Sequence, residues 1–216
     1  MKIGRRLAIK VLNASKFALT MGGDADLDLD ITHVVQPLDR SMLAGLREVV
    51  ASATTALENY EHARALEITE SFFWTFCDDY LELVKERAYN HEGKWSDQAS
   101  ASARAALAIA IDTFVRLLAP YLPFVTEEVW SWYREGSVHQ AAWPTTSNLE
   151  VTPDGSIEGA IEDASSVLLG VASEALVVLR RVKSEAKVSP RTPFLEVTVS
   201  APEQMIPLLE EVLEDL

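Results

Sequence analysis

Apolar residues recur at helical spacing through most of this 216-residue chain. In the clearest stretch, residues 62–88, the apolar positions are 65, 69, 72, 73, 76, 80, 83 and 84. Alternating steps of three and four residues are typical of an amphipathic helix that buries one face. The same period predicts helices over about residues 2–19, 38–59 and 97–118, and a long helix from about 156 to 187. We therefore expect a mainly α protein built around an antiparallel helical bundle.

Breaks in this pattern divide the chain into two predicted domains. The stretch "APYLPF" forces a bend before a short helix near residues 126–130, and a loop-like stretch of glycine, proline and serine follows it. We place the helical-bundle domain at residues 1–145 and a smaller domain at residues 146–216. The smaller domain would hold the long helix, a strand in "PFLEVTVSAP" and a helix at the end. One strand cannot form a sheet, so this second domain is predicted to be an incomplete α/β piece and the chain a fragment.

Charge is distributed unevenly along the sequence. The formal net charge is −14, yet residues 2–17 hold Lys2, Arg5, Arg6, Lys10 and Lys16 and no acidic residue. A second basic cluster, residues 180–191, is diluted only by Glu185. Binding of a polyanion depends on where charges lie, so an acidic protein can still carry a local nucleic-acid surface. The acidic loop at residues 24–30 lacks the glycine and terminal glutamate of a calcium loop, and we expect a solvated linker there.

Several classes of protein do not match the sequence. A single cysteine, Cys77, excludes an internal disulfide and fits a reducing compartment. No apolar run reaches the roughly 18 residues that a membrane span needs, so we expect a cytoplasmic protein without a membrane partner. We also expect a monomer.

No catalytic or metal site is apparent. The sequence has no glycine-rich phosphate loop, and its four histidines are scattered. Cys77 lies on the apolar stripe of its helix, which favours an inert core thiol. The adjacent carboxylates Asp78-Asp79 and Glu127-Glu128 point in different directions on a helix and are poor candidates for a catalytic pair. We predict no catalytic residue, no metal ligand and no cofactor in this chain.

The first helix carries a candidate nucleic-acid surface. Its apolar stripe is Ile3, Leu7, Val11, Ala14 and Ala18. A different face carries Lys2, Arg6, Lys10, Asn13 and Phe17, so an aromatic ring lies among cations and an amide. Cations bind phosphates, an amide can read a base edge and a ring can stack on an unpaired base. The alternative is that Phe17 fills a gap and the cations are merely solvated.

The helix over residues 62–88 adds to this surface. Trp74 and Leu81 point away from its apolar stripe, next to Asp78, Glu82 and Lys85. Apolar groups that face outward on two helices can form one exposed site, or they can pack against a neighbouring domain. An acidic helical module that binds a protein therefore stays an alternative.

Four stretches resemble, in order, the tRNA anticodon-binding region of class I valyl-tRNA synthetases: "KIGRRLAIKVLNASKF", "FFWTFCDDYLELVKERAY", "LLAPYLPFVTEEVW" and "GSVHQAAWP". The resemblance covers about residues 2–144 and continues more loosely through "VVLRRVKSEAKVSPRTPFLEV". Isoleucyl and leucyl enzymes share the bundle and variants of "LAPxLPFxxEE", and remain alternatives. The stretches "CDDYLE" and "EGSVHxAxWP" favour the valine family.

The resemblance implies a function for the candidate surface. In the family, the full-length enzyme charges tRNA with valine using ATP and magnesium, and neither its catalytic signatures nor its editing domain occur here. This chain alone is therefore expected to be non-catalytic and to bind tRNA rather than DNA. The family places anticodon bases against the positions of Phe17, Leu81 and Glu82. Helical geometry adds four neighbours on the first helix, namely Arg6, Lys10, Asn13 and Lys16.

Overall fold

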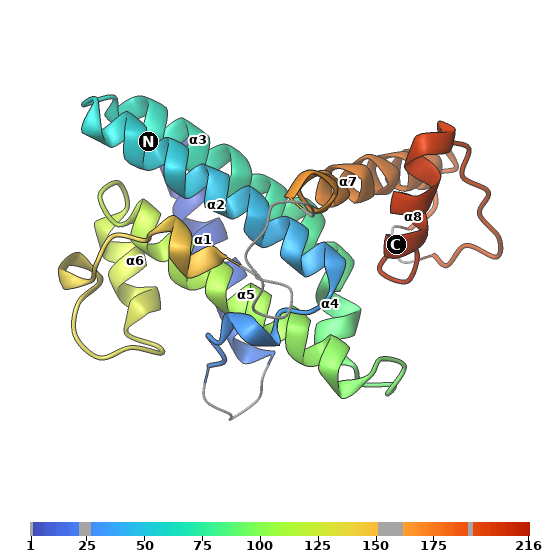
Figure 1. The fold of residues 1–216 in the computed structure, drawn as a ribbon, viewed down its shortest axis with the longest axis horizontal. Coiled ribbons are helices and arrows are strands. Elements are labelled where there is room, and N and C mark those ends of the chain that lie inside the picture. Colours follow the sequence, from blue (N-terminus) through green and yellow to red (C-terminus); the bar gives the residue numbers. More distant parts are fainter. Residues whose placement is uncertain (1, 22–26, 151–161, 190–191) are drawn as a thin grey trace.

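The computed structural model describes residues 2–21, 27–150, 162–189 and 192–216, and within them the protein is a helical bundle (Figure 1). Its α-helices are α1 (Lys2–Thr20), α2 (Pro37–Glu58), α3 (His62–Thr75), α4 (Leu81–Tyr89), α5 (Asp97–Leu118), α6 (Pro123–Trp130), α7 (Glu162–Glu185) and α8 (Ile206–Val212). A π-helical turn, η2 (Phe76–Tyr80), joins α3 to α4. Short 3₁₀ helices are η1 (Ile31–His33), η3 (Val138–Gln140), η4 (Thr146–Leu149) and η5 (Glu203–Met205). The predicted mainly α bundle is confirmed.

Helix α5 forms the centre of the bundle. It is buried around most of its circumference and packs against α1, α2, α3, α4 and α6. Alanines such as Ala103, Ala106 and Ala110 let neighbouring backbones approach closely, while Phe114 packs against the rings of Phe73 and Phe76. Helices α2 and α3 form a hairpin, because a short turn separates them and they pack along their lengths.

The π turn is the main departure from the predicted helices. We expected one continuous helix over residues 62–88, but the wide turn at Phe76–Tyr80 inserts one residue and rotates α4 relative to α3. Leu81 therefore turns inward, with 7% of its surface exposed, and joins the hydrophobic core. The prediction that Leu81 points outward is wrong for this reason.

Among the described residues, the part of the chain assigned to the second domain holds η4, α7, η5 and α8. The first half of α7 buries Leu168, Leu169 and Ala172 against α2, as its spacing predicts. The start expected near residue 156 lies outside the described residues. The predicted strand is wrong, because residues 192–199 have no regular structure and Leu195 is fully exposed. Alternation alone does not make a strand, since its backbone groups need a paired neighbour.

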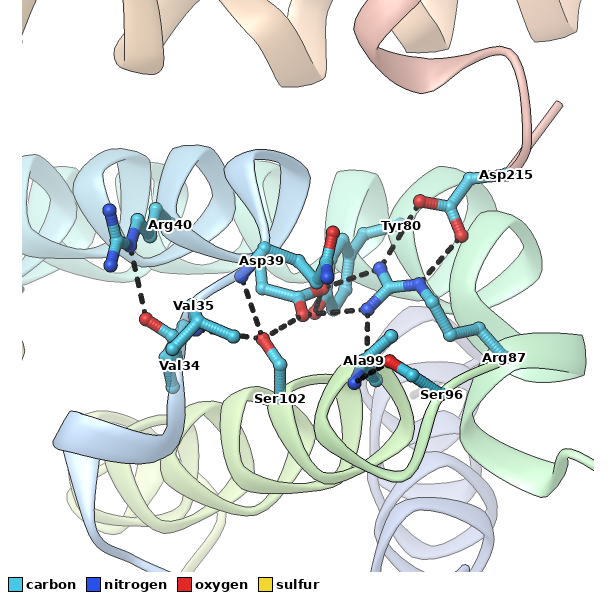
Figure 2. Close-up of polar contacts among 11 residues, drawn as sticks. Val34, Val35, Asp39, Arg40, Tyr80, Arg87, Ser96, Ala99, Ser102 and Asp215 are labelled. Atoms are coloured by element: carbon cyan, nitrogen blue, oxygen red, sulfur yellow. Dashed lines mark hydrogen bonds and ion pairs between the residues drawn. The ribbon is translucent and has the colours of Figure 1, made fainter.

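A buried polar network ties the helices together (Figure 2). The Arg87 guanidinium donates to both carboxylate oxygens of Asp39 at 2.8 Å and to both carboxylate oxygens of Asp215 at 2.8 and 3.2 Å. Asp39 also accepts hydrogen bonds from Tyr80 at 2.7 Å and Ser102 at 2.6 Å. Burial raises the pKa of Tyr80 well above its usual value, so the hydroxyl keeps its proton and donates it. The network holds α2, α4, α5 and the segment after α8 in one arrangement.

Candidate functional site

Helix α1 orients its two faces as the sequence predicts. Leu7, Val11, Ala14 and Ala18 are buried, while Arg6, Asn13 and Lys16 are exposed. The side chain of Ile3, predicted for the same stripe, lies outside the described residues. The buried stripe packs on α5 and α6, so the polar face is turned away from the centre of the bundle.

The cations of α1 gather around Trp74 of α3. The Arg6 guanidinium lies 4.8 Å from the Trp74 ring centroid, and the Lys10 ammonium lies 5.7 Å from it. The Trp74 indole N–H donates to Glu70 at 3.2 Å, and Lys10 forms a 2.8 Å ion pair with Asp78 of the π turn. Trp74 does leave the apolar stripe as predicted, and its ring becomes a half-buried support for two cations.

Phe17 belongs to a second cluster at the other end of the same face. It is half-buried and meets Tyr89 of α4 edge-on, with ring centroids 5.6 Å apart. Tyr89 in turn stacks on His91 at 5.0 Å. Sequence reasoning missed Tyr89 and His91, because they lie at and beyond the end of the periodic stretch. The left-handed Asn90 between them, with φ of 45°, ends α4 and brings these two rings together.

Three contacts show the direction in which α1 runs relative to α3 and α4. Arg6 meets Trp74, Lys10 meets Asp78 and Phe17 meets Tyr89, so partners advance along both elements together. Helix α1 therefore runs parallel to the rod made by α3, the π turn and α4. The polar edge of this rod includes Glu82, which is exposed and pairs with Lys85 at 2.6 Å. Leu81 lies beside Glu82 but inside the core.

Other chemically reactive groups have structural surroundings. Burial raises the pKa of the Cys77 thiol to about 12, which agrees with an inert core cysteine. Glu127 accepts hydrogen bonds from the Ser137 hydroxyl at 2.9 Å and the Val138 N–H at 3.0 Å, and so fixes the loop after α6. A pocket of about 320 Å³ lies between α5 and α6, but its Asp112 already pairs with Arg116 at 2.6 Å and Arg134 at 3.3 Å.

Nowhere among the described residues do three His, Cys, Asp or Glu side chains come together so that they could hold a metal ion. Across the same residues, no helix is both long and apolar enough to cross a membrane.

A model of the anticodon-binding domain of tRNA ligases matches residues 39–199. The chain belongs to this family. The chain is also similar to valine–tRNA ligases: it is 56% identical to the Salinispora tropica ligase over 206 residues, covering 92% of this chain and 24% of the relative. The chain is 53% identical to the Cutibacterium acnes ligase, covering 100% of this chain and 23% of the relative. It is 55% identical to the Thermobifida fusca ligase, covering 92% of this chain and 21% of the relative.

The comparisons confirm the resemblance read from the sequence. The chain spans about a quarter of the length of these relatives. The relatives named here are valine–tRNA ligases, so the isoleucyl and leucyl alternatives are not favoured. Helix α1 precedes the range matched by the family model, yet the similarity to the Cutibacterium acnes ligase covers the whole chain.

Proposed function

We propose that this chain recognises the anticodon arm of valine tRNA, as one part of a ligase that joins valine to tRNA. The observation that carries the proposal is one face of α1. At one end of this face Arg6 and Lys10 cluster on Trp74, and at the other end Phe17 contacts the ring of Tyr89. This face occurs in a chain of the anticodon-binding family. The conversion of valine, ATP and tRNA by the whole enzyme is part of the same proposal, and we assign these residues no step of that chemistry.

The aromatic cluster is the proposed base-binding part. An unpaired base can stack on a ring face of half-buried Phe17 or of exposed Tyr89, and base–aromatic stacking contributes about 1–3 kcal/mol. Asn13 and Glu82 are exposed polar groups on the two flanking helices and are suited to hydrogen bonds with base edges. Leu81 is nearly buried, so its proposed part is to support Glu82 from beneath.

The cations of α1 are the proposed phosphate-binding part. Arg6 and Lys16 are exposed, and Lys10 remains partly accessible beside Asp78. Phosphate contacts of this kind add affinity that falls steeply as salt rises, because binding releases counterions. Sequence preference should therefore depend on the aromatic end, while overall affinity should depend on the cationic end.

The test is a filter-binding assay at low salt with the anticodon stem-loop of valine tRNA and an unrelated stem-loop. We expect the unmodified chain to prefer the valine stem-loop and Phe17→Ala to weaken that complex by about 1–3 kcal/mol. Phe124→Ala is the matched control, because Phe124 is an almost fully exposed ring on α6. Equal binding of the two stem-loops by the unmodified chain would contradict the proposal.

A further inference from the structure

Two basic segments far apart in the sequence meet at the π turn. Lys10 of α1 pairs with Asp78 at 2.8 Å, and Arg180 of α7 pairs with the adjacent Asp79 at 3.1 Å. Arg180 also donates a hydrogen bond to the Asp78 backbone carbonyl. The Arg180 guanidinium therefore contacts both a side chain and a backbone carbonyl of the π turn. These contacts hold α7 next to the cationic face of α1.

Helix α7 has two halves of different character. The first half is buried against α2 through Leu168, Leu169 and Ala172. Beyond Ala175 the helix is mostly exposed, and Figure 1 shows α7 extending from the bundle toward α8. Arg180 and Lys183 are spaced i, i+3, which places them on one side of this half. Lys187 lies two residues beyond the end of α7, in a left-handed conformation with φ of 53°.

The exposed half is cationic in a protein that is otherwise acidic. Arg181 and Lys187 are exposed, and Lys183 is partly exposed with its ammonium 4.6 Å from the Phe194 ring centroid. Only Glu185 carries a negative charge between Arg180 and Lys187. Clustered cations on a chain of net charge −14 indicate a local surface for a polyanion.

The position of this half favours RNA over an acidic protein. Through Asp78 and Asp79, Arg180 of α7 continues the row that begins with Arg6 and Lys10 on α1, and Arg181 follows it directly in the sequence. An extended row of cations that reaches over two helices suits the repeating charge of a phosphate backbone. An acidic protein partner is the competing occupant that the experiment must separate.

We infer that the C-terminal half of α7 binds the phosphate backbone of the same RNA whose unpaired bases lie against Phe17, an inference that rests on the proposed function. Arg181 of α7 and Lys187, just beyond the end of α7, are both exposed and contact phosphates. Arg180 is a positioning residue, because its guanidinium is already occupied by the π turn. The surface contributes affinity without sequence preference, since phosphates carry no base identity.

The test uses the full chain with Arg181→Gln and Lys187→Gln, singly and combined, and two anticodon stem-loops measured at several salt concentrations. The double variant should bind both stem-loops more weakly, on the order of tenfold near 0.1 M salt, with an unchanged preference between them. The slope of log affinity against log salt should become shallower by roughly 0.9 for each lost phosphate contact. Arg64→Gln is the control, because Arg64 is an exposed cation at the far end of α3, paired with Glu67.

The outcomes separate the two proposals. If the unmodified chain prefers the valine stem-loop while the double variant matches Arg64→Gln in affinity and slope, the α7 inference is overturned and the proposed function stands. Retention of both RNA affinities together with loss of an acidic protein partner would likewise overturn it. Absence of any RNA binding by the unmodified chain would overturn both.

Discussion

Arg87 and Asp39 form a bidentate ion pair, and both side chains are fully buried. The two charges neutralise each other, Tyr80 and Ser102 donate further hydrogen bonds to Asp39, and Arg87 donates to Asp215 and to the Ala99 carbonyl. A buried pair of this kind is costly to assemble and more costly to break, because removal of one partner leaves an uncompensated charge in the core.

Arg87→Met should therefore destabilise the fold by about 3–5 kcal/mol in urea unfolding. Arg64→Met is the control, since Arg64 forms an exposed pair with Glu67 that should contribute less than about 1 kcal/mol. Adding Asp39→Asn to Arg87→Met should recover part of the loss, because it removes the charge of Asp39, one of the two carboxylates that Arg87→Met leaves without their cation. A double variant less stable than Arg87→Met alone would contradict this account.

Cys77 should be unreactive in the folded protein. Burial raises the pKa of its thiol to about 12, so almost none of the reactive thiolate is present near neutral pH. We expect a chromogenic disulfide reagent at pH 8 to modify Cys77 only in urea concentrations that unfold the protein. Rapid labelling without urea would show that the thiol is accessible.

The fold was predictable wherever burial of one helix face sets the pattern. The stripes of α1 and α2 appear in the sequence because each helix buries one face, whereas α5 is buried around most of its circumference. The π turn was not predictable, because Phe76, Cys77, Tyr80 and Leu81 are all apolar or aromatic and a one-residue rotation leaves such a stripe intact. The strand was wrong because its alternation is local, whereas pairing needs a second strand.

The residues of the candidate site could be predicted better than the contacts that these residues make. The spacing on α1 separates the exposed residues Arg6, Asn13 and Lys16 from the buried stripe, whereas Phe17 is half-buried and packs against the core. Which groups they meet depends on how α1 lies against α3 and α4, and the contact between Phe17 and Tyr89 has no local signature. The same holds for Arg180 and Asp78, which are 102 residues apart.

His33 should titrate above its ordinary range. Its hydrogen bond to Asp28, at 2.7 Å, raises the pKa of the imidazole because it favours the protonated form. The contact therefore stabilises η1 most fully below the unfolded pKa of about 6.5, and this contribution is lost as pH rises through the folded pKa. NMR titration should show the raised pKa of His33, and Asp28→Asn should return it toward the ordinary value. An identical pKa in the two proteins would contradict the pairing.

Two helical glycines should respond oppositely to alanine. A Cβ at Gly45 of α2 would lie 2.8 Å from the ring of Phe72, whereas a Cβ at Gly170 of α7 would meet nothing within 4 Å. Gly170→Ala should stabilise the protein by up to about 1 kcal/mol through helix propensity, since no contact opposes it. At Gly45 the same gain is opposed by an overpacking cost of about 1–3 kcal/mol, so Gly45→Ala should be neutral or destabilising. Equal stabilisation by the two substitutions in urea unfolding would show that the spacing between α2 and α3 does not depend on Gly45.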